Sequence, residues 1–133
     1  MVPGSRIWHI DPAFTDSRGT IYNIFAQALV ALEEYPVNIV HVALIFSLPG
    51  SIRGNHMHSE DSHYSYILAG KAEYWEPDFD EAQVLVPGDL LFTPAGIPHA
   101  FRFIETTSFL ALTTKARDGD LYEEDTHPVP VIS

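Results

Sequence analysis

Short apolar runs separated by Pro and Gly make up most of the chain, a spacing that predicts many short β-strands rather than long helices. Residues 36–47 (PVNIVHVALIFS) are rich in β-branched and aromatic side chains and end at a Pro-Gly turn signal, which predicts a buried strand. Further strands are predicted at 63–69, 72–75, 83–86, 90–93, 99–104 and 108–113. Gly70 and Lys71 alone separate two of these runs, which indicates a hairpin, and Gly50 and Gly88 are expected to close hairpins as well. The fold class predicted from this pattern is all-β.

Two segments depart from the strand pattern. Apolar residues recur at helical spacing around 26–34, which predicts one short N-terminal helix packed on a sheet. Residues 115–133 are rich in charge and then in Pro, which indicates an irregular C-terminal arm. With 133 residues and no internal repeat, the chain is predicted to be a single domain over 1–133.

The composition and net charge of the chain exclude several classes of protein and of binding partner. Hydrophobic residues make up 46% and charged residues 19%, so the chain is not a disordered acidic segment. Eighteen acidic residues against seven Lys and Arg give a net charge of -11, which repels phosphate backbones and anionic lipids. We therefore expect neither a nucleic acid nor a membrane as partner. The absence of Cys, of a long apolar run and of a signal-peptide core at residues 1–6 makes a cytoplasmic location the expectation.

Four of the seven histidines provide the main chemical signal. His56 and His58 lie two residues apart, so in an extended segment both imidazoles face the same side. His63 opens the next predicted strand and can be presented beside this pair, and His99 comes from a separate part of the chain. Neutral imidazoles suit one divalent transition metal ion such as Zn, Fe, Ni, Mn or Cu, and do not suit Ca or Mg. Taken one at a time, these histidines are more often surface or core residues than ligands.

The residues around these histidines resemble the two motifs of the cupin family. The first motif is matched by Gly50, His56, His58, His63 and Gly70, with His63 where the family usually has Glu, and the second by Gly88, Pro94, Gly96 and His99. Arg102 stands where an Asn often follows. The resemblance covers 50–103 and implies a cupin jelly-roll barrel, also called a double-stranded β-helix. It also implies one metal ion per chain, held by His56, His58, His63 and His99.

Histidine in place of the usual Glu has a chemical consequence. Losing a carboxylate ligand leaves an ion with its full dipositive charge, which favours Lewis acidity. If His63 instead turns outward, three histidines remain, and Glu60 and Asp61 in the intervening loop are candidate replacements.

The segment 53–58 (RGNHMH) resembles a signature of cupins that modify nucleotide-linked sugars, including keto-isomerases and epimerases, and of polysaccharide-biosynthesis cupins. The stretches 14–19 and 122–126 resemble further segments of the sugar epimerases. The resemblance implies a small-molecule substrate of carbohydrate type and makes Arg53, His56, His58 and Tyr66 the candidate catalytic residues. Arg53 would pair with an anionic group, and Tyr64 or Tyr66 would donate a proton. Alternation opposes this last role, because an inward His63 places Tyr64 and Tyr66 on the opposite face.

Several functions stay open at this point. A metal-assisted isomerase or epimerase is the leading hypothesis, and the alternatives are a non-haem dioxygenase, a non-catalytic ligand-binding cupin with a structural metal, and a metal-free enzyme that uses His56 or His58 as proton carrier. Whether the chain is an enzyme is therefore not decided by the sequence. Cupins of this kind form dimers and an open sheet edge favours strand pairing, so a homodimer is expected.

Overall fold

The computed structural model describes residues 5–26, 28, 38–115 and 124–133. Twelve strands lie in these residues: β1 (Arg6–His9), β2 (Phe14–Asp16), β3 (Gly19–Ile21), β4 (His41–Ser47), β5 (Ile52–His58), β6 (His63–Ala69), β7 (Ala72–Trp75), β8 (Gln83–Leu85), β9 (Asp89–Thr93), β10 (His99–Phe103), β11 (Thr107–Thr113) and β12 (Thr126–Pro128). The helix predicted over 26–34 lies almost wholly outside the described residues.

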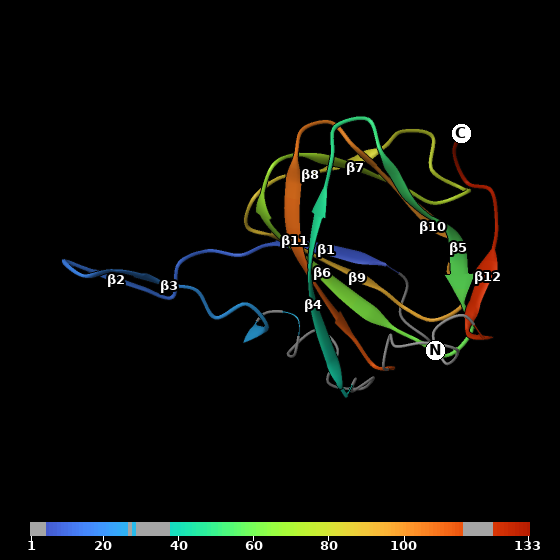
Figure 1. The fold of residues 1–133 in the computed structure, drawn as a ribbon. Coiled ribbons are helices and arrows are strands. Elements are labelled where there is room, and N and C mark those ends of the chain that lie inside the picture. The colour runs from blue at the N-terminus through green and yellow to red at the C-terminus, as the bar shows by residue number, and fades with distance from the viewer. Residues whose placement is uncertain (1–4, 27, 29–37, 116–123) are drawn as a thin grey trace.

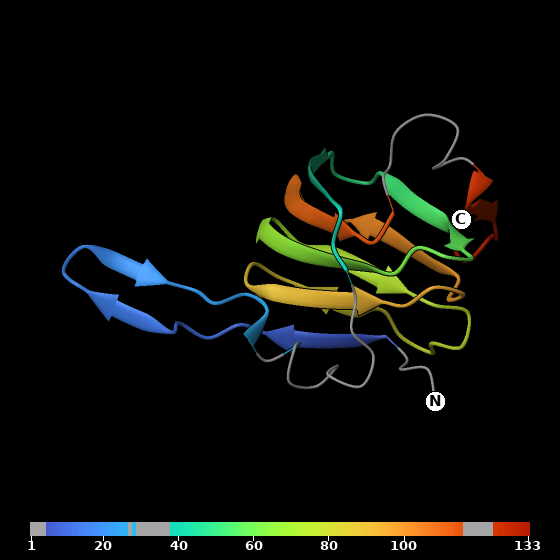
Figure 2. The ribbon, with the colours of Figure 1, turned by 90° about the horizontal axis from the view of Figure 1, so that it is seen from below.

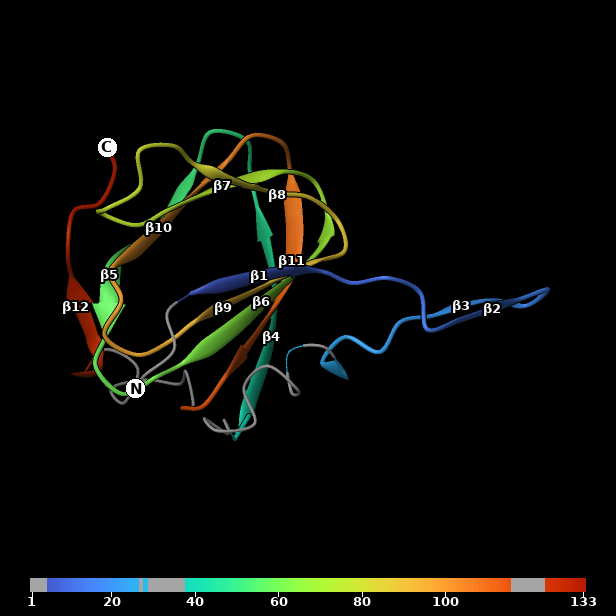
Figure 3. The same cartoon turned by 180° about the vertical axis from the view of Figure 1, so that it is seen from behind.

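Two five-stranded antiparallel sheets form the walls of a barrel (Figure 1). Sheet I has the strand order β1-β9-β6-β11-β4, and sheet II has the order β12-β5-β10-β7-β8. Viewed from below, the strands of the two sheets lie in two layers (Figure 2). The strands β2 and β3 pair with each other and form an arm that leaves the barrel on the side away from β12 (Figures 1 and 3).

Consecutive strands from β4 onward alternate between the two sheets, except for the β7–β8 hairpin. This winding confirms the jelly-roll fold. The prediction that Gly50, Gly70 and Gly88 close hairpins was wrong, because the strands on either side of each glycine belong to different sheets. Each of these glycines instead stands where the chain crosses from one sheet to the other, with a φ of +79°, +97° and +93° respectively. At Gly70 a Cβ would overlap the Thr106 carbonyl oxygen, so this crossing requires glycine.

The predicted strand positions agree closely with the observed ones. The strands β6 and β7 have the predicted bounds, and β8, β9, β10 and β11 differ from theirs by one residue at an end. The long run at 36–47 becomes a strand only from His41 among the described residues. The pattern did not predict β1, β2, β3 or β12, which are only three or four residues long. It also did not predict the seven-residue β5, whose extended conformation around His56 was considered only as a condition for metal binding.

The main core lies between the two sheets. Its aromatic part is formed by Phe101 and Phe103 of β10 and Phe109 of β11, whose ring centroids lie 5.8–6.0 Å apart in near-parallel stacks. A second apolar cluster covers the outer face of sheet I, where Tyr64 and Phe92 pack against the N-terminal segment. The strands β6 and β9 are buried on both faces for this reason.

Among the described residues, no helix has the length and the apolar character needed to cross a membrane.

The stacked core predicts a large loss of stability on truncation. Phe103 is fully buried, so Phe103→Ala should lower the free energy of unfolding by about 3–5 kcal/mol. Urea denaturation followed by circular dichroism measures this loss. The matched control is Val84→Ala on β8, where the side chain is half exposed and the change should stay within about 0.5 kcal/mol. Similar losses in the two variants would contradict the assignment of the core.

Candidate metal centre

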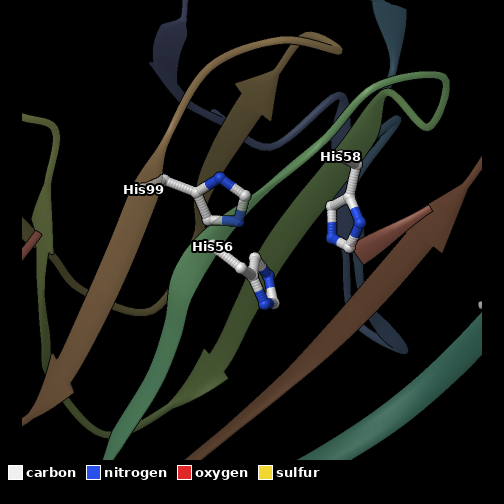
Figure 4. A group of neighbouring side chains, drawn as sticks. All are labelled: His56, His58 and His99. Carbon is white, nitrogen blue, oxygen red and sulfur yellow. The ribbon is translucent and has the colours of Figure 1, made fainter. Parts of the chain in front are cut away.

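Two neighbouring strands of sheet II carry three of the histidines. In the antiparallel pairing of β5 with β10, His56 lies opposite His99, and His58 follows two residues later on β5. The three imidazoles point toward one another (Figure 4). Their ring centroids are 4.5 Å apart for His56 and His58, 4.9 Å for His56 and His99, and 5.9 Å for His58 and His99.

These three side chains form a candidate ligand set. One ring nitrogen from each of His56, His58 and His99 lies within 4.8 Å of the other two. Three neutral imidazoles with this spacing can converge on one ion, and this donor type suits Zn, Fe, Ni, Mn or Cu. The chemistry of the donor set therefore fits a transition metal.

Hydrogen bonds to backbone carbonyls orient two of the rings. The Nδ1 of His99 donates to the Ile97 carbonyl oxygen at 2.9 Å, and the Nδ1 of His58 lies 3.3 Å from the Asp125 carbonyl oxygen. A carbonyl oxygen can only accept, so both Nδ1 atoms carry the proton and both Nε2 atoms have the lone pair that a metal needs.

Burial keeps His99 in its neutral form. Removal from water lowers the pKa of His99 well below its usual range, and His63, His56 and His58 lower it further, against a smaller opposing effect of the Ile97 carbonyl. The neutral imidazole is the form that binds a metal ion. The environment of His99 thus favours coordination rather than proton binding at neutral pH.

His63 lies beside this set on sheet I. Its ring centroid is 5.0 Å from that of His99 and 5.7 Å from that of His58, so all four predicted histidines come together. The ligand atoms of His63 group with those of His58 and Asp61 in a second cluster within 4.8 Å. The four predicted histidines thus lie together in two overlapping groups that share His58, and Asp61 belongs to the second group.

The two carboxylates of the loop before β6 have different surroundings. Asp61 is 3% exposed, its Oδ2 lies 3.7 Å from His63 Nδ1, and its Oδ1 accepts hydrogen bonds from the backbone and the hydroxyl of Thr114. Glu60 is exposed and forms an ion pair with Lys115. Of these two candidates, only Asp61 belongs to the site.

A β-bulge sets the inward face of β5. The register shifts so that His99 opposes His56 while Ala100 opposes Gly54, which makes Asn55 the extra residue, with a φ of 55°. The bulge reverses the alternation, so Arg53, which lies opposite the inward-facing Phe101, shares a face with His56. A Cβ at Gly54 would lie 2.9 Å from the His99 carbonyl oxygen, so glycine is required for this close approach.

A cavity of about 320 Å³ opens beside the histidines. His56, His63 and His99 line it together with Arg53, and Phe101 and Phe109 form an apolar wall. The Arg53 guanidinium is held by hydrogen bonds from Nε to Ser47 Oγ at 2.7 Å and from Nη2 to the Phe46 carbonyl oxygen at 3.2 Å. The cavity therefore combines a histidine cluster, a fixed cation and an aromatic surface.

The structure does not bring Tyr66 to this cavity. Tyr64 and Tyr66 pack in the cluster on the outer face of sheet I, as alternation from His63 indicates, and burial raises the pKa of Tyr64 to about 12. Tyr74 of β7, which the sequence reasoning missed, lies beside the histidines but is not among the residues that line this cavity. The ring of Tyr74 stacks on His99 with centroids 6.4 Å apart, and its hydroxyl donates to Glu76 Oε2 at 2.6 Å. Strand alternation could have predicted the inward direction of Tyr74, because Ala72 lies two residues earlier on the same strand and also faces the core.

The C-terminal segment supports the site from outside the barrel. Residues 126–128 form β12, which pairs with β5, so the expectation of a wholly irregular arm over 115–133 was wrong for these residues. The Asp125 carboxylate accepts hydrogen bonds from the backbone N–H groups of Ser59, Glu60 and Asp61 and from the Ser59 hydroxyl. Asp125 thereby holds the loop that connects His58 to His63.

The family whose model matches this chain is described as Cupin domain, and the match covers residues 45–126. The DNA damage-repair/toleration protein DRT102 of Arabidopsis thaliana is 36% identical over 67 residues, which are 50% of this chain and 21% of that protein. The chain thus spans about a fifth of the length of this curated relative.

Solved structures share the fold. The rmlC epimerase of Mycobacterium tuberculosis is 15% identical, with a TM-score of 0.77, over 96% of this chain and 69% of that one. A 3,4-ketoisomerase from Helicobacter canadensis is 22% identical, with a TM-score of 0.69, over 90% and 92%. A 3'-monoepimerase from Streptomyces bikiniensis, solved in complex with dTDP-quinovose, is 16% identical, with a TM-score of 0.73, over 95% and 69%.

The bonds to Asp125 predict a pH-dependent contribution to stability. Burial raises the pKa of the Asp125 carboxyl, but the hydrogen bonds from Ser59, Asp61 and Glu60 outweigh burial and lower it below the usual 3.8. The ionised carboxylate therefore stabilises the folded state at pH values above the ordinary pKa of 3.8. This stabilisation is lost as the pH falls through the lowered pKa of the folded state. Asp125→Asn should be less stable than the wild type in urea at pH 7, and the difference should shrink at pH 3. The exposed Glu105→Gln serves as control, and a difference independent of pH would contradict the assignment.

Proposed function

The chain belongs to the cupin domain family, and from this premise we propose that it binds one divalent transition metal ion and isomerises or epimerises an oxygenated small molecule of carbohydrate type. The observation that carries the proposal is the convergence of three imidazoles beside a cavity that also contains Arg53. Metal ligands next to a ligand-sized cavity are typical of catalytic sites, whereas structural metal sites are usually closed by protein ligands.

In this proposal His56, His58 and His99 hold the ion. Their Nε2 atoms are the donors where the ring is oriented by a carbonyl, as in His58 and His99. A bound ion of this type supplies Lewis acidity toward a keto or hydroxyl oxygen of the substrate. A set of three protein ligands would be typical of a catalytic rather than a purely structural metal site.

The residues of the chain supply binding and proton transfer. Arg53 is positioned to pair with an anionic group of the substrate, because its guanidinium is already fixed by Ser47 and Phe46. His63 lines the cavity and has the Asp61 carboxylate beside its Nδ1, which leaves Nε2 as the atom that takes a proton from the substrate and returns it. Phe101 and Phe109 supply an apolar wall for the bound substrate.

The size of the cavity favours a sugar unit. A volume of about 320 Å³ lies at the lower end of the range for ligand sites, so a single ring fits inside and an attached nucleotide would extend out of it. The epimerase of the same fold that was solved with dTDP-quinovose supports this substrate class.

The proposed metal site predicts a defined metal content. The purified wild type should contain or take up about one equivalent of a transition metal per chain, and His58→Ala should lose it, because the set of three imidazoles is broken. Elemental analysis of protein without a histidine tag measures this. The control is His9→Ala, which removes a histidine that pairs with Asp89 outside the candidate set. If the wild type binds no metal on titration, the metal proposal fails, and metal-free acid–base catalysis by His56 or His58 replaces it.

The position of Arg53 in the cavity predicts a role in substrate binding. With a dTDP-linked 4-keto sugar as substrate, Arg53→Ala should raise KM by roughly tenfold to a hundredfold, because a charge-assisted hydrogen bond is lost. Exchange of substrate protons with solvent deuterium, followed by NMR, measures turnover, and oxygen uptake in the same samples tests the dioxygenase alternative. The control is Arg102→Ala, whose guanidinium contacts Glu73 and Ser133 outside the cavity. Equal effects of the two substitutions would contradict a role of Arg53 in binding.

A further inference from the structure

A second cavity lies on the outer face of sheet I, at the base of the β2–β3 arm. Its volume is about 310 Å³, and it is formed where the chain leaves β1 for the arm and where the chain returns at Tyr22 (Figure 1). The strand β6 separates the two cavities, because His63 and Ser65 line the cavity of the candidate metal centre, whereas Tyr66 and Leu68 line the second one. Tyr66, a candidate catalytic residue from the sequence, therefore lines a separate cavity.

A buried carboxylate fixes the imidazole of His9 at this second cavity. His9 lies opposite Asp89 in the pairing of β1 with β9, and its Nδ1 donates to Asp89 Oδ1 at 2.7 Å. Asp89 is 7% exposed, and its Oδ2 accepts a hydrogen bond from the Val86 backbone N–H at 2.9 Å. Because Nδ1 carries the proton, Nε2 of the neutral ring is a hydrogen-bond acceptor. His9 lines the cavity and supplies this acceptor to it.

The other side chains with polar atoms at this cavity are a carboxylate and two tyrosine hydroxyls. Asp11 is exposed, and its ionised carboxylate can only accept hydrogen bonds. Burial raises the pKa of Tyr66, and the neighbouring Tyr22 raises it further, so Tyr66 keeps its hydroxyl proton at neutral pH. Of the described residues that line the cavity, none is Lys or Arg. The cavity therefore has an excess of hydrogen-bond acceptors and a negative charge.

We propose that this second cavity binds a small organic ammonium ion. An ammonium group donates several hydrogen bonds and carries the charge that complements the Asp11 carboxylate. The rings of Tyr22 and Tyr66 line the same cavity, and the face of an aromatic ring attracts a cation. The net charge of -11 also repels anions from the protein and attracts cations to it. A volume at the lower end of the range for ligand sites fits a ligand of about one six-membered ring.

Titration of the full chain with cyclohexylammonium, followed by two-dimensional amide NMR, tests the proposal. The amide signals of Tyr66 and Gly88, which line the second cavity, should shift in a saturable manner. The amide signal of Gly54, which lines the cavity of the candidate metal centre, should not shift. Cyclohexanol has a similar shape without the charge, so it should bind at least ~10-fold more weakly.

Two substitutions at exposed positions test the location. Asp11→Asn should weaken the binding of cyclohexylammonium at least ~5-fold, because it removes the carboxylate that pairs with the ammonium group. Tyr22→Leu should weaken binding about twofold to fivefold, because it removes one aromatic ring from the cavity. The matched control is Asp78→Asn, which removes the same charge from an exposed position between β7 and β8 and should leave binding unchanged. Circular dichroism verifies that each variant is folded.

The proposal is overturned by any of three results. The lack of saturable shifts at tens of millimolar cyclohexylammonium would show that the cavity binds no ammonium ion. Equal affinities for cyclohexylammonium and cyclohexanol would remove the role of charge. Unchanged binding by both Asp11→Asn and Tyr22→Leu, or shifts confined to the candidate metal centre, would place the ligand elsewhere. These measurements involve neither metal nor turnover, so this site and the proposed function stand or fall separately.

Discussion

The register of β5 against β10 is the constraint on which the candidate site depends. In that register His56 lies opposite His99, and the extra residue at Asn55 turns both Arg53 and His56 toward the cavity. Without the bulge, strict alternation would send Arg53 to the outer face together with Met57. A shift by one residue would likewise separate the imidazoles. One irregularity in the ladder thus brings a cation and a histidine cluster to the same wall.

The C-terminal segment secures this register from the outer edge of sheet II. The Asn55 side chain accepts hydrogen bonds from the backbone of Val131 and Ile132 and donates one to the Ile132 carbonyl oxygen. β12 pairs with β5 so that Thr126 lies opposite His58. The side-chain amide and the backbone carbonyl of the bulge residue are therefore hydrogen-bonded to a segment about 75 positions later in the sequence. This explains how a residue with a positive φ is held at the centre of the site.

What the sequence could predict follows from the range of the interactions involved. The bounds of β6 and β7 are local properties of alternation and turn residues, and the sequence was sufficient for them. It left open whether His63 turns inward. Gly70 can lie in a hairpin or in a connection between the two sheets, depending on which strand β7 pairs with. That pairing is a long-range property, and the predicted hairpin at Gly70 was wrong. The inward turn of Arg53 and the strand β12 likewise depend on pairings between distant segments.

The replacement of the usual family Glu by His63 relocates a negative charge rather than removing it. Asp61 is buried two residues before His63, and its carboxylate lies beside the ring, outside the set of three histidines. In the function proposed above, three neutral imidazoles would leave a bound divalent ion its full charge, which favours Lewis acidity toward a substrate oxygen. The carboxylate instead lies beside His63, a ring that lines the cavity, with Asp61 Oδ2 3.7 Å from His63 Nδ1. The proposed metal ligands of sheet II and the proposed proton carrier on sheet I thus belong to facing sheets, with the ring centroids of His99 and His63 5.0 Å apart.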